Sequence, residues 1–161
     1  VNGKDGKPFK TRDGGVATLQ SMIDLTYEEA KKTVETSSKN ENLSKEEKEE
    51  IAKIVSLAAI KFADLSNYRM ADYIFTPEKF TSFEGKTGPY ILYTIVRIKS
   101  ILNKIEKQKN DKIIIKNDCE KKLALKLLEF ADVVNFAWEK RAPNFLCAYI
   151  YDLAQIYNSF E

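Results

Sequence analysis

The sequence contains no histidine among its 161 residues. Histidine is the commonest general base near neutral pH and the commonest metal ligand in proteins. Catalysis by Ser–His or Cys–His pairs, or by a zinc-bound water, is therefore not expected, and we predict no metal site. Acidic pairs such as Glu28-Glu29 and Glu49-Glu50 are interpreted as solvated helix faces, because no carboxylate pair stands out as an acid/base couple.

Cysteine and long apolar runs are also scarce. Cys119 and Cys147 lack the spacing of metal or redox motifs and fit reduced thiols of a cytosolic protein. No apolar run reaches the roughly 18 residues of a membrane span, and the polar first residues do not resemble a signal peptide. We therefore expect a cytoplasmic protein without a membrane partner. The apolar fraction of 43% is typical of a folded chain, and the net charge of +2 does not by itself indicate a nucleic-acid binder.

Apolar residues at helical spacing predict a mainly α protein whose second half is a helical bundle. Ser44-Lys45-Glu46-Glu47 has the pattern of a capping box, and Pro77 and Pro89 each suit the first position of a helix. Ile113-Ile114-Ile115, within a charged connector, also fits a short strand. The expected helices span 19–37, 45 to about 64, a short turn from 77, 89 to about 105, 119–141, and 145 to the end.

Two of these helices have clear apolar faces, which we expect to lie in the core. For the helix from residue 45 the face consists of Ile51, Ile54, Val55, Ala58, Ala59 and Phe62. For the helix over 119–141 it consists of Leu123, Leu127, Phe130, Val134 and Trp138.

The helix from Pro89 carries two distinct faces. At 100° per residue, Tyr90, Tyr93 and Arg97 fall within an arc of about 60°, which we call the Tyr–Arg strip. The isoleucines and leucine on the other side form the expected core face: Ile91, Ile95, Ile98, Leu102 and Ile105. Aromatic rings and a guanidinium on one strip suit unstacked RNA bases. Alternatively, both tyrosines are half-buried edges of the core with their hydroxyls in water.

Basic residues gather in two places. Near the N-terminus, Lys4, Lys7, Lys10 and Arg12 lie among glycines in what we interpret as a hairpin-like loop. Such a loop can wrap phosphates, although it lacks the P-loop spacing and also fits a generic basic hairpin. The second basic stretch, 85–109, includes Lys86 and also fits a solvated helix face.

Four segments, in order, resemble bacterial arginyl-tRNA synthetases. The stretch 3–15 is similar to the second signature loop, and 58–65 followed by Arg69 and 72–75 is similar to the helix and link after it. Residues 82–93, with 97–98 and 100–101, resemble the start of the anticodon-binding domain, and 148–155 with 158–160 resemble a late helix of that domain. Cysteinyl and some glycyl enzymes carry a related helical domain. The resemblance implies that residues 1–82 end a class I catalytic domain and that 83–161 form a helical anticodon-binding domain, truncated at its C-terminus.

The family's activity implies the expected substrates and roles. A class I enzyme activates arginine with ATP, with Mg²⁺ in the full-length protein, and transfers it to tRNA(Arg). The resemblance implies catalytic roles for Lys10 and Arg12 in an ATP-phosphate loop that comprises Lys7, Phe9, Lys10, Thr11 and Arg12. The order of basic residues departs from the standard signature, so the resemblance does not decide which of the two meets phosphate. Anticodon-binding positions correspond to Tyr90, Tyr93, Arg97 and Lys86.

The absence of histidine means that the first class I signature, His-Ile-Gly-His, is not in this chain. We therefore expect that the chain alone does not form arginyl-adenylate. We expect a monomer and no DNA partner. Two other interpretations remain open: a helical scaffold whose tyrosines contact proteins, and a stand-alone regulatory RNA-binding paralogue.

Overall fold

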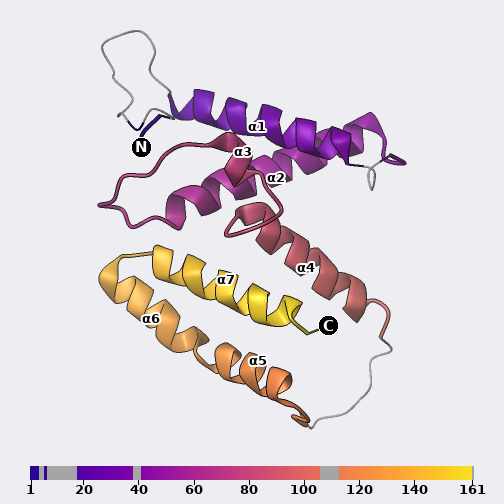
Figure 1. Cartoon of the computed structure of the whole chain (residues 1–161), viewed down its shortest axis with the longest axis vertical. Helices are drawn as coiled ribbons and strands as arrows, with labels where there is room; N and C mark the ends of the chain where they lie inside the picture. The colour runs from indigo at the N-terminus through magenta and orange to yellow at the C-terminus, as the bar shows by residue number, and fades with distance from the viewer. Residues whose placement is uncertain (4–5, 7–17, 38–40, 106–112, 161) are drawn as a thin grey trace. The chain divides into compact units, whose positions relative to one another are not determined.

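The computed structural model describes residues 1–3, 6, 18–37, 41–105 and 113–160. These residues are mainly helical, as predicted, and the chain divides into two compact units, Val1–Leu92 and Tyr93–Glu161 (Figure 1). Helix α4 (Gly88–Leu102) continues from the first unit into the second. Within the described ranges, no helix combines the length and apolar character needed to cross a membrane.

Local capping signals define the helices of the first unit. Helix α1 (Leu19–Thr36) begins where the Thr18 side chain accepts a hydrogen bond from the backbone N–H of Ser21. Helix α2 (Lys45–Leu65) begins with the predicted capping box, in which Ser44 and Glu47 each accept a hydrogen bond from the other's backbone N–H. Helix α3 (Pro77–Phe80) has its proline at the first position, as predicted.

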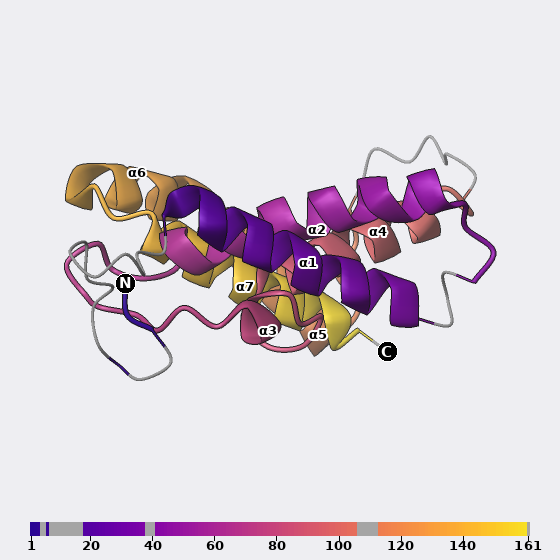
Figure 2. The same cartoon turned by 90° about the horizontal axis from the view of Figure 1, so that it is seen from above.

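The core of the first unit lies between α1 and α2, which pack along each other (Figure 2). The predicted core face of α2 is partly wrong, because Ile54 is exposed and Ile51, Ala58 and Phe62 are only half-buried. The row of α2 residues that is buried is displaced around the helix from the predicted face. It consists mainly of small side chains, which let two helices approach closely. The buried residues are Met22, Thr26, Ala30 and Val34 from α1, and Ala52, Val55, Ser56, Ala59 and Ala63 from α2.

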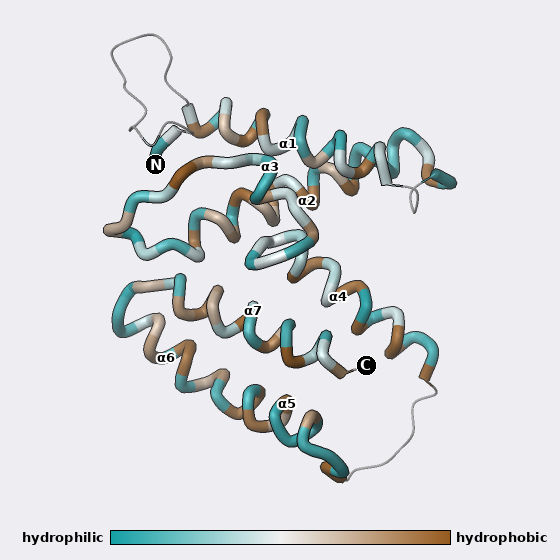
Figure 3. Tube along the Cα trace, viewed as in Figure 1, coloured by the Kyte–Doolittle hydropathy of each residue, from teal (hydrophilic) through white to brown (hydrophobic). Residues whose placement is uncertain are grey.

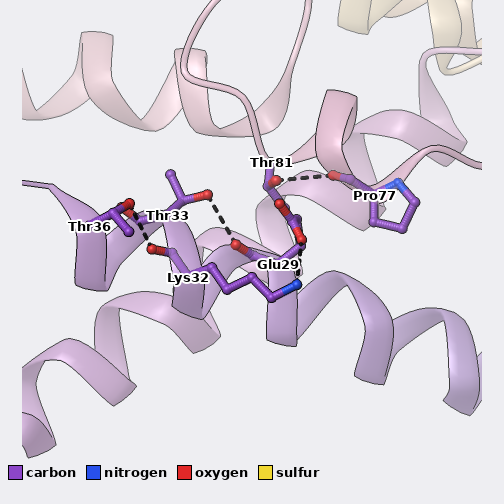
Figure 4. A network of polar contacts seen from close by, with 6 residues as sticks. All are labelled: Glu29, Lys32, Thr33, Thr36, Pro77 and Thr81. Atoms are coloured by element: carbon purple, nitrogen blue, oxygen red, sulfur yellow. Dashed lines mark hydrogen bonds and ion pairs between the residues drawn. The ribbon is translucent and has the colours of Figure 1, made fainter.

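Threonines are buried in this unit without leaving their hydroxyls unsatisfied. Thr81 donates a hydrogen bond to the Pro77 carbonyl at 3.0 Å (Figure 4), and Thr26 donates to the Met22 carbonyl at 2.7 Å. The half-buried Thr33 of α1 donates to the Glu29 carbonyl in the same manner (Figure 4). Because each hydroxyl bonds to its own helix or turn, burial of these residues carries no desolvation penalty for an unpaired group.

The link after α2 is held to the N-terminus and to α2. Asn2 exchanges backbone hydrogen bonds with Tyr73 and Phe75, at 2.8 and 2.9 Å. The Tyr73 hydroxyl donates to Asp64 Oδ1 at 3.0 Å. Burial and this hydrogen bond to a carboxylate raise the pKa of Tyr73 to about 12.

Spectrophotometric titration of the tyrosines is expected to show a component near pH 12 from Tyr73. The folded pKa of Tyr73 is about 12, above the usual 10, so its stabilising contribution is complete below pH 10 and is lost as the pH rises from 10 to 12. The Tyr73→Phe variant should lose the component near pH 12 in the phenolate absorbance. If the Tyr73→Phe variant instead loses a component near pH 10, where an unperturbed tyrosine ionises, this assignment is contradicted.

The second unit comprises the rest of α4 and the helices α5 (Asp118–Leu128), α6 (Phe130–Lys140) and α7 (Asn144–Asn158). The single helix predicted over 119–141 is therefore wrong, because Glu129 separates α5 from α6. At this break the Tyr149 hydroxyl of α7 donates to the Lys126 carbonyl at 2.8 Å. A continuous helix would offer that carbonyl to the N–H four residues later, so a tertiary hydrogen bond coincides with the break.

Lys126 of α5 contacts both the turn at Glu129 and α7. Its ammonium lies 3.0 Å from a carboxylate oxygen of Glu129 and 3.7 Å from one of Asp152, and 5.2 Å from the centre of the Tyr149 ring. Hydrogen bonding to Glu129 is the main cause of the raised pKa of Lys126, and burial opposes it. The contacts connect α5, the turn at Glu129 and α7, while Tyr149 itself is buried.

Other predictions for this unit are also corrected. The side of 119–141 expected in the core is largely exposed at Leu127, Phe130, Val134 and Trp138, with Trp138 83% exposed. The side buried against α7 instead carries the small Ala137, because a small residue permits close helix packing. Residues 113–115 form no strand and are exposed. Apolar segments recur between polar ones along α4 and α7 (Figure 3), as the amphipathic pattern predicts.

Candidate functional site

The start of α4 is fixed by backbone turns and one threonine. Gly85 has a positive φ of 78°, a conformation that favours glycine. Thr87 then accepts a hydrogen bond from the Tyr90 N–H at 3.2 Å, while its hydroxyl donates to the Ser82 carbonyl at 2.6 Å. This double contact caps the helix and fixes the backbone from which the Tyr90 side chain projects.

Gly88, the first residue of α4, lies directly against the backbone of α2. A Cβ at this position would overlap the carbonyl oxygen and carbon of Ala58. Gly88 and Pro89 are both buried. The close approach of Gly88 to Ala58 therefore fixes the position of the first turn of α4, from which the Tyr–Arg strip begins.

The three residues of the Tyr–Arg strip differ in exposure. Tyr93 is 45% exposed, whereas Tyr90 and Arg97 are half-buried, and Lys86 is exposed just before the helix. Tyr90 and Arg97 thus lie at the edge of the packed side of α4, and Tyr93 lies farther toward solvent. The helix brings the three residues onto one strip, and Lys86 precedes them in the loop.

The core face expected for α4 is only partly correct. Ile95, Leu102 and Ile105 are exposed, and the two other members of that face, Ile91 and Ile98, are half-buried. The buried residue of the second unit's part of α4 is instead Thr94, which is 3% exposed. The buried side of this part of α4 therefore lies between the Tyr–Arg strip and the face formed by the isoleucines.

A polar cluster explains why Thr94 is buried. Its hydroxyl oxygen accepts a hydrogen bond from Asn158 Nδ2 at 2.9 Å. The other end of the same amide, Asn158 Oδ1, accepts from Arg97 Nη1 at 3.4 Å. We call these three residues the Thr94–Asn158–Arg97 cluster, and it joins the strip to the end of α7.

Sequence reasoning did not assign a role to Thr94 or Asn158. Thr94 lies about 40° from Tyr90 at 100° per residue, between the two faces, so helical periodicity singles it out for neither. Asn158 is 61 residues from Arg97 in the chain, and no local pattern connects them. The one feature of the sequence that could have indicated Thr94 is that it is a polar residue at the edge of an apolar helix face.

The predicted ATP-phosphate loop, which includes Lys7, Phe9, Lys10, Thr11 and Arg12, lies outside the described residues. Next to it, Gly6 has a φ of 73° and donates its N–H to the Gly3 carbonyl at 2.9 Å. Among the residues that the structure describes, no group of three or more His, Cys, Asp and Glu side chains could hold a metal ion.

Comparison with known families matches both halves of the chain. Residues 1–76 match the family described as tRNA synthetases class I (R), catalytic domain. Residues 91–160 match the family described as DALR anticodon binding domain. The strip residues Tyr93 and Arg97 lie within the second match, and Tyr90 immediately precedes it.

Individual relatives align over nearly the whole chain. Arginine–tRNA ligases of Agathobacter rectalis and Alkaliphilus oremlandii are each 49% identical over 99% of this chain, which spans 28% and 27% of their lengths. The solved Thermus thermophilus arginyl-tRNA synthetase is similar over 99% of this chain and 26% of its own, at 31% identity and a TM-score of 0.84. The Plasmodium falciparum arginyl-tRNA synthetase covers 89% of this chain at 27% identity and a TM-score of 0.73.

Proposed function

The chain belongs to the arginyl-tRNA synthetase family, and we propose that it is part of an enzyme that ligates arginine to tRNA(Arg) with ATP. Because the chain spans about 28% of the length of the curated relatives it matches, this activity is proposed for the full-length protein. We assign residues 1–82 to the end of the catalytic domain and residues 83–161 to the anticodon-binding domain. The proposed setting is the cytoplasm, with a monomeric enzyme that acts on tRNA and not on DNA.

The proposed contribution of this chain is to bind the anticodon region of the tRNA through Tyr90, Tyr93, Arg97 and Lys86. The single observation that carries this proposal is the exposed Tyr93 ring, on the same helical strip as Tyr90 and Arg97. An exposed ring can stack on an unpaired base, and a neighbouring guanidinium can pair with phosphate or stack itself. The match of 91–160 to an anticodon-binding domain supports the assignment.

The proposed contribution of the N-terminal segment is to steady the phosphates of ATP. Lys10 and Arg12 are proposed as the catalytic cations, in a loop with Lys7, Phe9 and Thr11. Their positive charge and the family match over 1–76 support this role. ATP is the proposed substrate, accompanied by Mg²⁺ in the full-length enzyme, and no residue of this chain is assigned to the metal.

Salt dependence of tRNA binding tests the proposed function. The logarithm of the association constant is expected to fall linearly with the logarithm of the salt concentration, by roughly 0.7–0.9 for each phosphate neutralised. Two or more contacts then predict that affinity for tRNA(Arg) falls about tenfold or more between 50 and 200 mM salt. The measurement is a fluorescence-anisotropy titration of the 161-residue chain with labelled tRNA(Arg). No detectable binding, or an affinity that salt does not change, would contradict the proposal and favour a scaffold whose tyrosines contact proteins.

A further inference from the structure

Asn158 lies where α7 ends, and it contacts both a buried and a partly exposed residue of α4. Its Nδ2 donates to the hydroxyl of the buried Thr94 at 2.9 Å, and its Oδ1 accepts from Arg97 Nη1 at 3.4 Å. We propose that Asn158 is a positioning residue that orients the Arg97 guanidinium for RNA. This inference rests on the proposed binding of tRNA by the Tyr–Arg strip.

Thr94 supplies a rigid anchor for the amide. It is 3% exposed and occupies the middle of α4, so its hydroxyl has a fixed position relative to the helix. Asn158 is the last residue of α7, and the next residue, Ser159, caps the helix by donating its N–H to the carbonyls of Gln155 and Ile156. Thr94 and Asn158 therefore both belong to helical backbone, and this fixes the position of the Asn158 amide beside the Thr94 hydroxyl.

The chemistry of the amide suits this task. A carboxamide carries a donor at one end and an acceptor at the other, so one side chain can bond to a hydroxyl oxygen and a guanidinium together. A carboxylate in the same place would also orient Arg97, but it would bring a negative charge that competes with phosphate for the guanidinium. The Asn158 oxygen orients the group without adding charge.

Orientation matters because arginine is long. Fixing a rotamer-rich side chain on binding carries an entropy loss, and a contact that already restricts the side chain in the unbound protein removes part of that loss. Asn158 thus acts on RNA affinity through Arg97, without contact with the RNA itself. The effect of changing Asn158 must then disappear when Arg97 is absent.

A double-mutant cycle on the full 161-residue chain tests this dependence. With labelled tRNA(Arg) as the probe, Asn158→Ala is expected to weaken binding about 2- to 10-fold when Arg97 is present, the effect of ordering one long side chain. In the Arg97→Ala background the same change is expected to have no effect. The salt slope of Asn158→Ala should also move toward that of Arg97→Ala, which is expected to lose about 0.7 for one phosphate contact.

Three variants serve as controls. Thr94→Val removes the hydroxyl and is expected to act like Asn158→Ala, whereas Thr94→Ser keeps the hydroxyl and should restore wild-type affinity. Gln155→Ala removes another amide of α7, one that donates to the Tyr151 hydroxyl, and should leave affinity unchanged. Circular dichroism of each variant confirms that α-helix content is retained, and the Thr94 pair gives the answer if Asn158→Ala does not fold.

The outcomes separate this inference from the proposed function. If Arg97→Ala binds tRNA as tightly as the wild type, the role of the strip in RNA binding fails. If Arg97→Ala weakens binding but Asn158→Ala has the same effect with and without Arg97, the tRNA proposal stands and the positioning role of Asn158 is wrong. Coupling between the two residues, together with the lowered salt slope, supports the inference.

Discussion

Replacing Tyr90 and Tyr93 together with alanine is expected to weaken the affinity of the chain for tRNA(Arg) by about 30-fold or more. Stacking of a base on an aromatic ring contributes about 1–3 kcal/mol, so two stacked bases contribute at least about 2 kcal/mol. Since 1.4 kcal/mol corresponds to a tenfold change, 2 kcal/mol gives about 30-fold. A gel-shift titration of wild type and double variant against tRNA(Arg) at one fixed salt concentration measures the change.

Two controls distinguish stacking from general damage. The Tyr90→Phe/Tyr93→Phe variant keeps both rings and should retain affinity within about threefold, the size expected for one modest neutral hydrogen bond. Tyr68→Ala removes a ring of nearly the same exposure as Tyr93, 46% against 45%, from the loop after α2. This variant should bind like the wild type. Equal affinities of the double alanine variant and the wild type would remove the strip from the RNA-binding site.

Replacing Gly88 with alanine is expected to destabilise the first unit by about 3 kcal/mol, the upper end of the usual penalty for overpacking. The new methyl group would overlap the Ala58 carbonyl, so the backbone at Gly88 or at Ala58 would have to shift. Urea unfolding followed by circular dichroism measures the loss.

Gly85→Ala is the matched control for this effect. Alanine is also unfavourable at Gly85, but only because of the backbone φ of 78°. No atom lies within 4 Å of an added Cβ there. Its expected loss is about 1 kcal/mol, the difference between alanine and glycine in the left-handed region. A loss for Gly88→Ala no larger than that for Gly85→Ala would show that the close contact with Ala58 is not important for stability.

Where helices begin was largely predictable from local residues. The Ser44–Glu47 capping box and the proline at the start of α3 both appear as expected, because a cap depends on residues three apart and on fixed backbone geometry. The break at Glu129 was not predictable. No glycine or proline marks it, and the Tyr149 hydroxyl that bonds to the Lys126 carbonyl beside it is 23 residues away from Lys126 in the chain.

The sequence by itself determined the α-helical class of the chain, where most helices begin, the common strip of Tyr90, Tyr93 and Arg97, and the family resemblance of the chain. These depend on short-range periodicity, since each residue of a helix turns by 100° whatever lies around it. The tertiary structure alone decided which side of each helix is buried and which residues hold the strip. Small residues rather than isoleucines line α2, and Asn158 reaches Thr94 and Arg97 from the end of another helix. Burial depends on contacts between segments that are distant in the sequence, and helical periodicity carries no information about which segments come into contact.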